Sequence, residues 1–195
     1  MKDFLNTHIQ LGNSRVHLSP FTKKDAKKLR AIIFDDDVWK YMGMFIKTED
    51  EFQNYIAETL SQQFKTAYSF IITDKLANET AGCTSYGNIN LKSEKLEIGW
   101  TWYGKKFQGI GLNKACKYEL LRYGFEEIGL RRIQFSADLE NLQSQKAIEK
   151  LGAVKEGVFR NNYIDPTGKS KNDVYYSIIK EDWATIKRTV FIDYL

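Results

Sequence analysis

The chain has 195 residues, of which 43% are hydrophobic and 14% aromatic, and its formal net charge at pH 7 is +4. The length suits one well-buried core rather than two, and the aromatic content excludes an intrinsically disordered chain. The charge is too diffuse for a nucleic-acid-binding protein, because no basic tract is interleaved with aromatic residues. We therefore expect a single domain over residues 1–195 and no nucleic-acid partner.

The N-terminal part of the chain predicts a strand followed by two helices. The strand covers residues 15–18, and Thr22 with Asp25 forms a capping pattern for a helix that runs toward Phe34. A second helix is expected over residues 48–63. Apolar side chains recur there at helical spacing, namely Phe52, Tyr55, Ile56 and Leu60.

Three strands are expected next. Residues 68–73 and 80–90 are typical of a hairpin with a turn near Asn78. In the third strand, residues 96–102, apolar residues alternate with a period of two. This pattern places four side chains on one face, Leu96, Ile98, Trp100 and Trp102. Glu97 then lies on the opposite face.

A glycine-rich turn follows that strand and opens a long helix. The turn reads Gln108-Gly109-Ile110-Gly111-Leu112-Asn113. The helix is indicated by the spacing of its apolar residues, Leu112, Cys116, Leu120 and Tyr123. Glycines let the backbone approach a ligand closely, and the free N–H groups of a helix start favour phosphate. The turn therefore predicts a site for a ligand that carries a pyrophosphate.

Two other nucleotide-binding motifs do not fit the sequence. A dinucleotide fingerprint would need a third glycine where Lys114 stands. Residues 168–170, Gly-Lys-Ser, imitate the end of a P-loop, but the glycine required five positions before Gly168 is Tyr163. Residues 165–168 are instead typical of a turn, so we expect a hairpin tip there.

The C-terminal part predicts one more strand, a helix and a final hairpin. The strand covers residues 133–137, and the helix begins at Asn141 and ends at Gly152. Residues 154–159 and 174–179 close the pattern as paired strands. Helices that cross between strands in the middle of the chain predict an α+β fold in layers.

Two motifs in this order resemble those of the GNAT N-acetyltransferases. Gln108, Gly111 and Asn113 fit the Gln/Arg-x-x-Gly-x-Gly/Ala pyrophosphate loop of that superfamily, with Asn113 a departure at its last position. Residues 141–153 resemble its second signature, in the Asn-x-x-Ser form. Residues 15–26 resemble the opening of the branch that includes ribosomal-protein N-terminal (alanine/serine), spermidine and antibiotic acetyltransferases. The resemblance covers almost the whole chain and implies the GNAT fold, a mixed central sheet with splayed middle strands and flanking helices.

The resemblance implies acetyl-CoA as co-substrate. Its pantetheine arm would lie between the splayed strands 96–102 and 133–137 and pair with exposed backbone groups there. The cofactor-binding residues expected on this basis are Trp100, Thr101, Trp102, Gln108, Gly109, Ile110, Gly111, Leu112, Asn113, Asn141, Ser144 and Lys150. Two alternating tryptophans are also common in a core, which is the alternative for Trp100 and Trp102.

Glu97 and Ser144 are the candidate catalytic residues. Acetyl transfer needs an amine that has lost its proton, and Glu97 could remove that proton directly or through water. The alternative for Glu97 is a salt bridge with a lysine or arginine. Many GNAT members carry a tyrosine four residues before Gly152 that protonates the departing thiolate, but Ile148 stands here. Ser144 is therefore the candidate donor to the thiolate, with capping of the helix start as its alternative role.

Three classes of acceptor amine fit the sequence: a protein N-terminus, a polyamine and an aminoglycoside-like molecule. The acidic run at residues 35–37, before Trp39 and Tyr41, could attract a cationic amine or could be a solvated acidic loop. Asn162 and Tyr163 are further candidates for acceptor contacts. We expect direct transfer in a ternary complex. The alternative is a CoA-binding sensor or accessory subunit that has lost catalysis, and the resemblance also allows a homodimer.

The remaining features bear on compartment and metals. Cys83 and Cys116 form no spaced framework, which favours a reducing compartment. No apolar run is long enough to span a bilayer, and residues 1–6 lack the apolar core of a signal peptide. We therefore expect a soluble, cytoplasmic protein with no membrane partner. His8 and His17 lack matched ligands nearby, so we expect no metal site.

Overall fold

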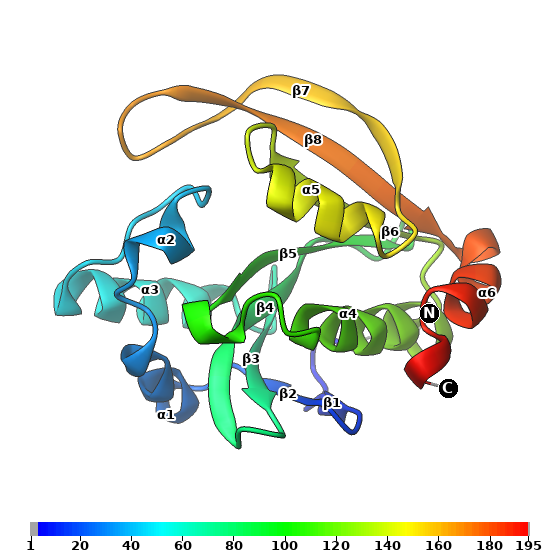
Figure 1. The fold of residues 1–195 in the computed structure, drawn as a ribbon, viewed down its shortest axis with the longest axis horizontal. Coiled ribbons are helices and arrows are strands. Elements are labelled where there is room, and N and C mark those ends of the chain that lie inside the picture. The colour runs from blue at the N-terminus through cyan, green and yellow to red at the C-terminus, as the bar shows by residue number, and fades with distance from the viewer. Residues whose placement is uncertain (1–3, 195) are drawn as a thin grey trace.

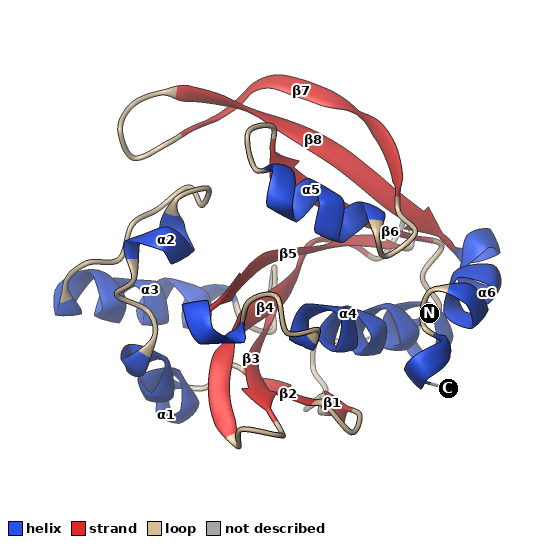
Figure 2. Cartoon of the chain, viewed as in Figure 1, coloured by secondary structure: helices blue, strands red, loops and turns tan. Residues whose placement is uncertain are grey.

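The computed structural model describes residues 4–194, and these contain one eight-stranded sheet with helices on both faces (Figure 1, Figure 2). The strands are β1 (Leu11–Gly12), β2 (Val16–Pro20), β3 (Tyr68–Asp74), β4 (Glu79–Asn90), β5 (Lys95–Tyr103), β6 (Arg132–Asp138), β7 (Val154–Ile164) and β8 (Ser170–Ile179). Their order in the sheet is β1-β2-β3-β4-β5-β6-β8-β7. Neighbouring strands are antiparallel except β5 and β6, which are parallel. This mixed sheet with flanking helices confirms the predicted α+β class.

The α-helices are α1 (Lys23–Ala26), α2 (Asp36–Trp39), α3 (Glu49–Gln62), α4 (Leu112–Arg122), α5 (Leu142–Glu149) and α6 (Lys180–Thr189). Short 3-10 turns cover Lys27–Ala31, Lys105–Phe107 and Ile192–Tyr194, and a π-helical turn, Tyr123–Ile128, continues α4. The longest helix of residues 4–194, α3, has 14 residues, and none of the described helices is long and apolar enough to cross a bilayer.

Two hydrophobic cores lie on opposite faces of the sheet. On one face, α4, α5 and α6 pack against the strands, where Phe70 and Ile72 of β3 point toward them. On the other face, α1, α2 and α3 form a smaller core that includes Ile71 of β3. Adjacent residues of one strand thus serve different cores, as the two-residue period of a strand requires. The sheet is buried on both sides over β3 to β5.

The middle strands diverge, as the family resemblance implied. β5 pairs with β6 only over Lys95–Glu97, opposite residues 132–134. Beyond Glu97, β5 pairs with β4 alone, while β6 continues along β8. Because β5 and β6 are parallel, their carboxyl ends lie at the same edge of the sheet. The helices that follow them, α4 and α5, therefore both begin at the open end of the divergence (Figure 1).

One predicted pattern, the shared face of Leu96, Ile98, Trp100 and Trp102, is wrong. Leu96 and Ile98 lie in the core beneath α4, whereas Trp102 lies in the core beneath α3. The cause is a bulge in β5. Cys83 pairs with Trp102 but Ser85 pairs with Gly99, so two residues of β5 lie opposite Thr84 alone. An extra residue of this kind reverses the alternation of side chains beyond it.

Other element predictions differ mainly at their ends. Thr22 caps α1 as predicted, accepting a hydrogen bond from the Asp25 N–H (3.1 Å), but the helical segment ends at Ala31, short of Phe34. Residues 165–168 form the tip of the β7–β8 hairpin, as predicted. The two strands of that hairpin are longer than the segments 154–159 and 174–179. The sequence reasoning missed three elements, β1, α2 and α6.

Candidate functional site

The glycine turn adopts a backbone that only glycine tolerates easily. Gly109 has φ 74° and Gly111 has φ 81°, in the left-handed region, and Gly111 is the N-cap of α4. A Cβ built on either glycine meets no atom within 4 Å. The space above the turn is therefore open, and a ligand can approach the backbone itself.

The amides of this turn are free to bind an anion. Within residues 4–194, none of the backbone N–H groups of residues 109–114 has a hydrogen-bond acceptor, and the first bond of the helix runs from the Ala115 N–H to the Gly111 carbonyl (3.2 Å). The α4 dipole adds partial positive charge at the same place. Consecutive free amides above an open cradle fit the pyrophosphate of a nucleotide cofactor such as acetyl-CoA.

Two polar side chains of the turn hold its shape. The Gln108 side chain turns back and donates to the Tyr103 carbonyl (3.0 Å). Asn113, which departs from the family motif, accepts a hydrogen bond from the Tyr103 hydroxyl (3.3 Å). Leu112 is fully buried under the turn, and Ile110 is exposed. Tyr103 thus ties the end of β5 to the start of α4.

The bulge in β5 separates the three neighbours Trp100, Thr101 and Trp102. Trp100 has φ 50° and a 47% exposed side chain. Thr101 points to the α4 face, where its Oγ1 accepts a hydrogen bond from Lys117 Nζ (2.6 Å). Trp102 is buried, and its Nε1 donates to the Tyr55 hydroxyl (3.1 Å). The core alternative therefore holds for the Trp102 side chain and fails for Trp100.

Glu97 is a buried carboxylate held by neutral donors. Its side chain accepts hydrogen bonds from Asn88 Nδ2 (2.8 Å), Gln134 Nε2 (2.9 Å) and Ser136 Oγ (2.6 Å). No lysine or arginine among residues 4–194 pairs with it, so the salt-bridge alternative fails. A carboxylate with fixed position and no cationic partner can accept a proton.

Asn141 and Ser144 lie together at the start of α5. The Asn141 side chain caps the helix by accepting from the Ser144 N–H (3.0 Å). The Ser144 hydroxyl is half-buried and has no hydrogen-bond partner within residues 4–194. Capping is thus performed by Asn141, and the Ser144 hydroxyl is free. Lys150 lies at the opposite end of α5, where it is the C-cap, so the structure does not bring it to Asn141 and Ser144.

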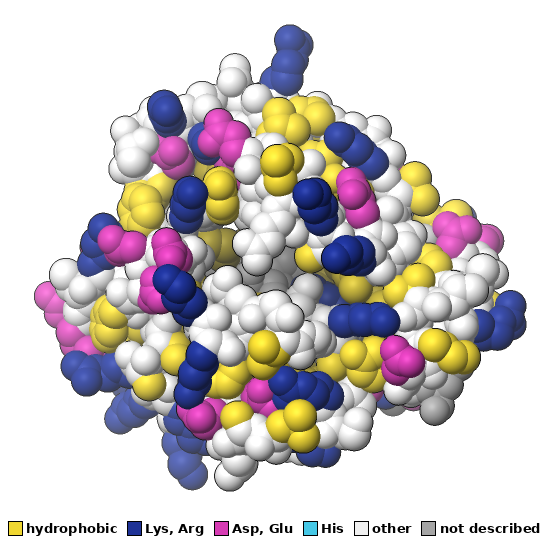
Figure 3. Space-filling model, in the orientation of Figure 1, with side chains coloured by type: hydrophobic (Ala, Val, Ile, Leu, Met, Phe, Trp, Pro, Cys, Tyr) yellow, Lys and Arg dark blue, Asp and Glu magenta, His cyan; other side chains and the backbone are white. Residues whose placement is uncertain are grey.

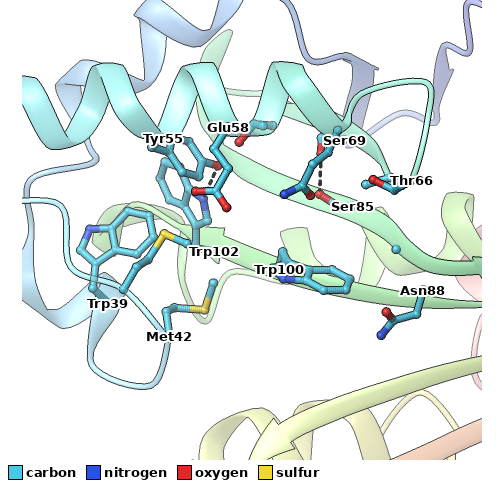
Figure 4. A pocket seen from close by; sticks show the side chains of 15 residues that line it. Trp39, Met42, Tyr55, Glu58, Thr66, Ser69, Ser85, Asn88, Trp100 and Trp102 are labelled. Atoms are coloured by element: carbon cyan, nitrogen blue, oxygen red, sulfur yellow. Dashed lines mark hydrogen bonds between the residues drawn. The ribbon is translucent and has the colours of Figure 1, made fainter. Parts of the chain in front are cut away.

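A cavity of about 370 Å³ lies on the α3 face of β4 and β5 (Figure 4). Trp39, Tyr55 and Trp102 gather at one end of it, and Trp100 and Asn88 lie at the other. The remaining lining residues are Met42, Met44, Glu58, Thr59, Gln62, Thr66, Ala67, Ser69, Ser85 and Gly87. The cavity is joined to Glu97 through Asn88, which lines it and donates to the Glu97 carboxylate.

The sequence reasoning missed Tyr55, Glu58 and Asn88 as site residues. Asn88 follows a glycine in the middle of a strand pattern, which is a signal for a bulge, and its φ is 47°. Glu58 lies one helical turn from Tyr55, next to the apolar face of α3. The sequence predicts that Glu58 lies beside Tyr55 on the helix, but it does not predict which side chains of the sheet face them.

The predicted acceptor contacts are engaged with other protein groups. Asp35 caps α2, while Asp36 pairs with Lys47 (3.0 Å) and Asp37 with Lys105 (2.9 Å). The acidic run is therefore largely neutralised at the surface. In the β7–β8 hairpin, the Tyr163 hydroxyl donates to Asp138 Oδ2 (2.7 Å) and Asn162 donates to Asp173 Oδ2 (2.7 Å). Burial, followed by the hydrogen bond to Asp138, raises the pKa of Tyr163.

The surface around the diverging strands is concave and carries positive charge. Figure 3 shows a hollow near the centre of this face, with several lysine and arginine side chains around it. A cationic rim attracts anionic ligands by long-range electrostatics. This charge agrees with the anion-binding geometry of the α4 N-terminus.

Comparisons with known proteins agree with this geometry. Residues 15–154, more than half of the chain, match the family described as "Acetyltransferase (GNAT) domain". The chain is 26% identical over 176 residues to the "Putative ribosomal N-acetyltransferase YdaF" of Bacillus subtilis (strain 168), covering 88% of this chain and 94% of that protein.

Solved structures show the same fold. A "putative acetyltransferase" from T. thermophilus is 31% identical with a TM-score of 0.86, covering 95% of this chain and 97% of that one. A "putative ribosomal-protein-serine acetyltransferase from Vibrio cholerae" is 23% identical with a TM-score of 0.75, covering 88% and 97%, and at that identity shows the fold alone. The matched domain and the similar proteins together show that the chain belongs to the GNAT family and is an N-acetyltransferase of the kind that uses acetyl-CoA as co-substrate.

Proposed function

We propose that the protein transfers an acetyl group from acetyl-CoA directly to a primary amine while both substrates are bound. The observation that carries this proposal is the row of free amides at residues 109–114, placed where β5 and β6 diverge. A buried carboxylate, Glu97, lies on β5 just before that divergence. An anion cradle and a proton acceptor on one strand–helix unit are what amine acetylation requires.

The cofactor would be held by backbone groups. Residues 109–113 would bind its pyrophosphate through their free N–H groups, and residues 100–102 would pair with its pantetheine arm. Trp100 and Thr101 support the second contact, because they lie outside the regular β4–β5 register. Asn141 and Ser144 would contact the arm from the other side, at the start of α5. The predicted contact from Lys150 stays a prediction, at the far end of that helix.

Glu97 would take the proton from the acceptor ammonium. The three neutral donors fix its carboxylate in place and leave its charge uncompensated, so it can also attract the cationic amine. A backbone N–H near Trp100 would donate to the oxygen of the acetyl group. Acetyl-CoA supplies the activated acetyl group and a thiolate as leaving group, and the free Ser144 hydroxyl would donate a proton to that thiolate.

Direct transfer, rather than transfer through a cysteine, is supported by the two thiols. Cys83 and Cys116 are both fully or almost fully buried in the cores. Burial raises the pKa of Cys83 to about 12 and also raises the pKa of Cys116. Neither thiol is a ready nucleophile under these conditions. Two free cysteines also support a reducing compartment, and we propose the cytoplasm as the location.

The proposal is tested by binding and turnover together. Calorimetry measures the affinity for acetyl-CoA, and thiol release is then followed with pools of ribosomal-protein N-terminal peptides, polyamines and aminoglycosides. We expect tight binding and release with at least one pool. The name of the Bacillus subtilis relative supports including the first pool. Binding without release from any pool would favour a sensor or accessory subunit, and absent binding would overturn the proposal.

A further inference from the structure

The cavity beside Glu97 is larger than an amine alone requires. Its volume is about 370 Å³, within the range of pockets that hold small organic ligands. It extends from Asn88 and Trp100, next to Glu97, to Trp39 and Tyr55 beneath α3 (Figure 4). An acceptor whose reacting amine lies near Glu97 would therefore place its next several atoms in this cavity.

The cavity lining is selective in charge. None of its fifteen lining residues is Lys, Arg or His, although the chain has 29 Lys and Arg residues. Its one carboxylate is Glu58, which projects from α3 (Figure 4). Within residues 4–194 the Glu58 side chain has no salt bridge or hydrogen bond. Two other acidic residues of α3 are engaged, Glu49 with Arg30 (2.8 Å) and Glu51 with the Lys47 N–H (2.7 Å).

The apolar lining is also suited to a cation. Trp39 lies against Trp102, with ring centroids 5.3 Å apart, and against Tyr55, at 6.1 Å. Trp100 adds a half-exposed indole, and Met42 and Met44 add thioethers. Aromatic faces attract ammonium and guanidinium groups, and a nearby carboxylate strengthens that attraction. The methylene groups of an aliphatic arm can pack on the same rings.

We propose that this cavity binds a second positively charged group of the acceptor, carried on an aliphatic arm, and that Glu58 determines the preference for it. The inference rests on the proposed function, because it assumes that the amine reacts beside Glu97. Two sources supply this chemistry, a free polyamine and a peptide whose N-terminal amine is followed by a lysine or arginine side chain.

Matched acceptors test the preference. For the first source, 1,4-diaminobutane is compared with pentylamine, which has the same length but one charge. For the second, an alanyl-lysyl peptide is compared with its alanyl-norleucyl counterpart. We expect the doubly charged member of at least one pair to have a kcat/KM about fivefold to tenfold higher at low salt, after correction for the two equivalent amines of the diamine. The pair that shows the preference identifies the source.

Glu58→Gln tests the residue. We expect it to raise KM for the doubly charged acceptor more than for the singly charged one, until the preference falls to about twofold or less. Asp50→Asn, on the same helix but outside the cavity, removes one negative charge as a control and should leave the preference intact. Equal kcat/KM within both pairs, or a preference that survives in Glu58→Gln, would overturn the proposal.

A binding measurement separates this proposal from the proposed function. Three of the four tryptophans, Trp39, Trp100 and Trp102, line the cavity, so their fluorescence reports ligands there. We expect 1,4-diaminobutane or the lysyl peptide to change the emission at lower concentration than its singly charged partner, and the difference to vanish in Glu58→Gln. That result without any thiol release would support the cation site and contradict the proposed acetyl transfer. Thiol release with no charge preference would support the acetyl transfer and contradict the cation site.

Discussion

The indole of Trp100 lies directly over Gly87, so that a Cβ built on Gly87 would overlap the six-membered ring of the tryptophan. Trp100 also has φ 50°, a conformation that costs a non-glycine residue about 1 to 2 kcal/mol. A strained, half-exposed tryptophan gains little from burial. Its position at the mouth of the cavity, beside Asn88, gives it a surface that an acceptor can contact.

Gly87→Ala should displace the Trp100 ring and impair the acceptor site. We expect kcat/KM for the acceptor to fall on the order of tenfold, because the displaced ring can no longer contact the acceptor. The affinity for acetyl-CoA should change by less than about twofold, since the glycine turn is untouched. The matched control is Gly157→Ala in β7, where an added Cβ meets no atom within 4 Å. Unchanged acceptor kinetics in Gly87→Ala would show that the ring is not part of the site.

Gly111→Asp should abolish acetyl-CoA binding, because it places a carboxylate at the open cradle above residues 109–114. Any side chain at Gly111 is also strained by φ 81°. Gly168→Asp controls for that strain, since Gly168 has φ 87° and equally open surroundings at the hairpin tip. Calorimetry should show a loss of more than about 100-fold in affinity for the first variant and none for the second. Equal affinities would remove the main support for the cofactor site.

Much of this site could be predicted from local signals. The cap at Thr22, the turn at residues 108–113 and the helix start at Asn141 each depend on neighbours in sequence, and all three are present. The alternation of residues 96–102 is local as well, but the bulge at Trp100 depends on β4, whose own Gly87 makes room for the ring. The side-chain directions beyond the bulge therefore depend on the pairing with β4, which the alternation within residues 96–102 does not contain.

The missed elements have a similar cause. α6 buries only Trp183 and Ile186 among its ten residues, so its apolar period is short. β7 is the edge strand and is almost wholly exposed, which removes the buried face that would mark its length. The lining of the cavity by Tyr55 and Glu58 depends on how α3 packs on the sheet. Helix docking is a tertiary property, and no local pattern contains it.

Glu97→Gln should impair turnover most strongly at low pH. An amine is mostly ammonium below its own pKa and then needs a base, whereas at higher pH it loses the proton to solvent. We expect a loss of about 100-fold or more near pH 6.5 that shrinks as the pH approaches the pKa of the acceptor amine. The measurement is the pH–rate profile under saturating acetyl-CoA.

The control for Glu97 is Glu119→Gln, which removes another buried carboxylate, one that accepts from Asn13 in the α4 core (3.1 Å). Any loss in that variant should be the same at every pH, because it acts through packing. A pH-independent loss in Glu97→Gln would assign Glu97 to the same structural class and leave the base unidentified.

Ser144→Ala separates thiolate protonation from helix capping, because the structure divides these roles between two residues. The cap uses the Asn141 side chain and the Ser144 backbone N–H, so Ser144→Ala should leave the unfolding free energy within about 0.5 kcal/mol of the parent. Asn141→Ala should cost about 1 kcal/mol. We expect kcat to fall about tenfold in Ser144→Ala and to recover in Ser144→Thr, which keeps a hydroxyl. An unchanged kcat in Ser144→Ala would show that the Ser144 hydroxyl takes no part in the reaction.

Lys117 is buried in the α4 face of the sheet without a carboxylate partner among residues 4–194. Its Nζ donates to the hydroxyls of Thr101 (2.6 Å) and Thr84 (3.3 Å), and these two hydroxyls also bond each other (2.7 Å). Burial lowers the pKa of Lys117 from 10.5 to about 8. The folded protein therefore releases this proton at a pH where the unfolded chain still holds it, and folding should become more favourable as the pH rises from about 8 toward 10.5.

Lys117→Met should remove this rise in stability with pH. In the parent, Lys117 should contribute about 2 kcal/mol to the rise in the free energy of unfolding between pH 7 and pH 9.5, since each pKa unit is worth about 1.4 kcal/mol. Burial raises the pKa of Cys83 and Cys116, so these thiols oppose the rise as the pH passes about 9, but they do so in parent and variant alike. The difference between the two proteins therefore carries the Lys117 contribution. The variant lacks the buried charge, and its two threonines keep their mutual hydrogen bond, so it should be the more stable protein at pH 7. Urea unfolding at both pH values measures the difference.

The buried tyrosines act at higher pH. Burial raises the pKa of Tyr86 and Tyr103 well above their usual value, so they lower stability only as the pH passes about 10. Their contribution is common to both proteins. Parallel pH dependences for parent and variant would mean that Lys117 keeps an ordinary pKa in the fold.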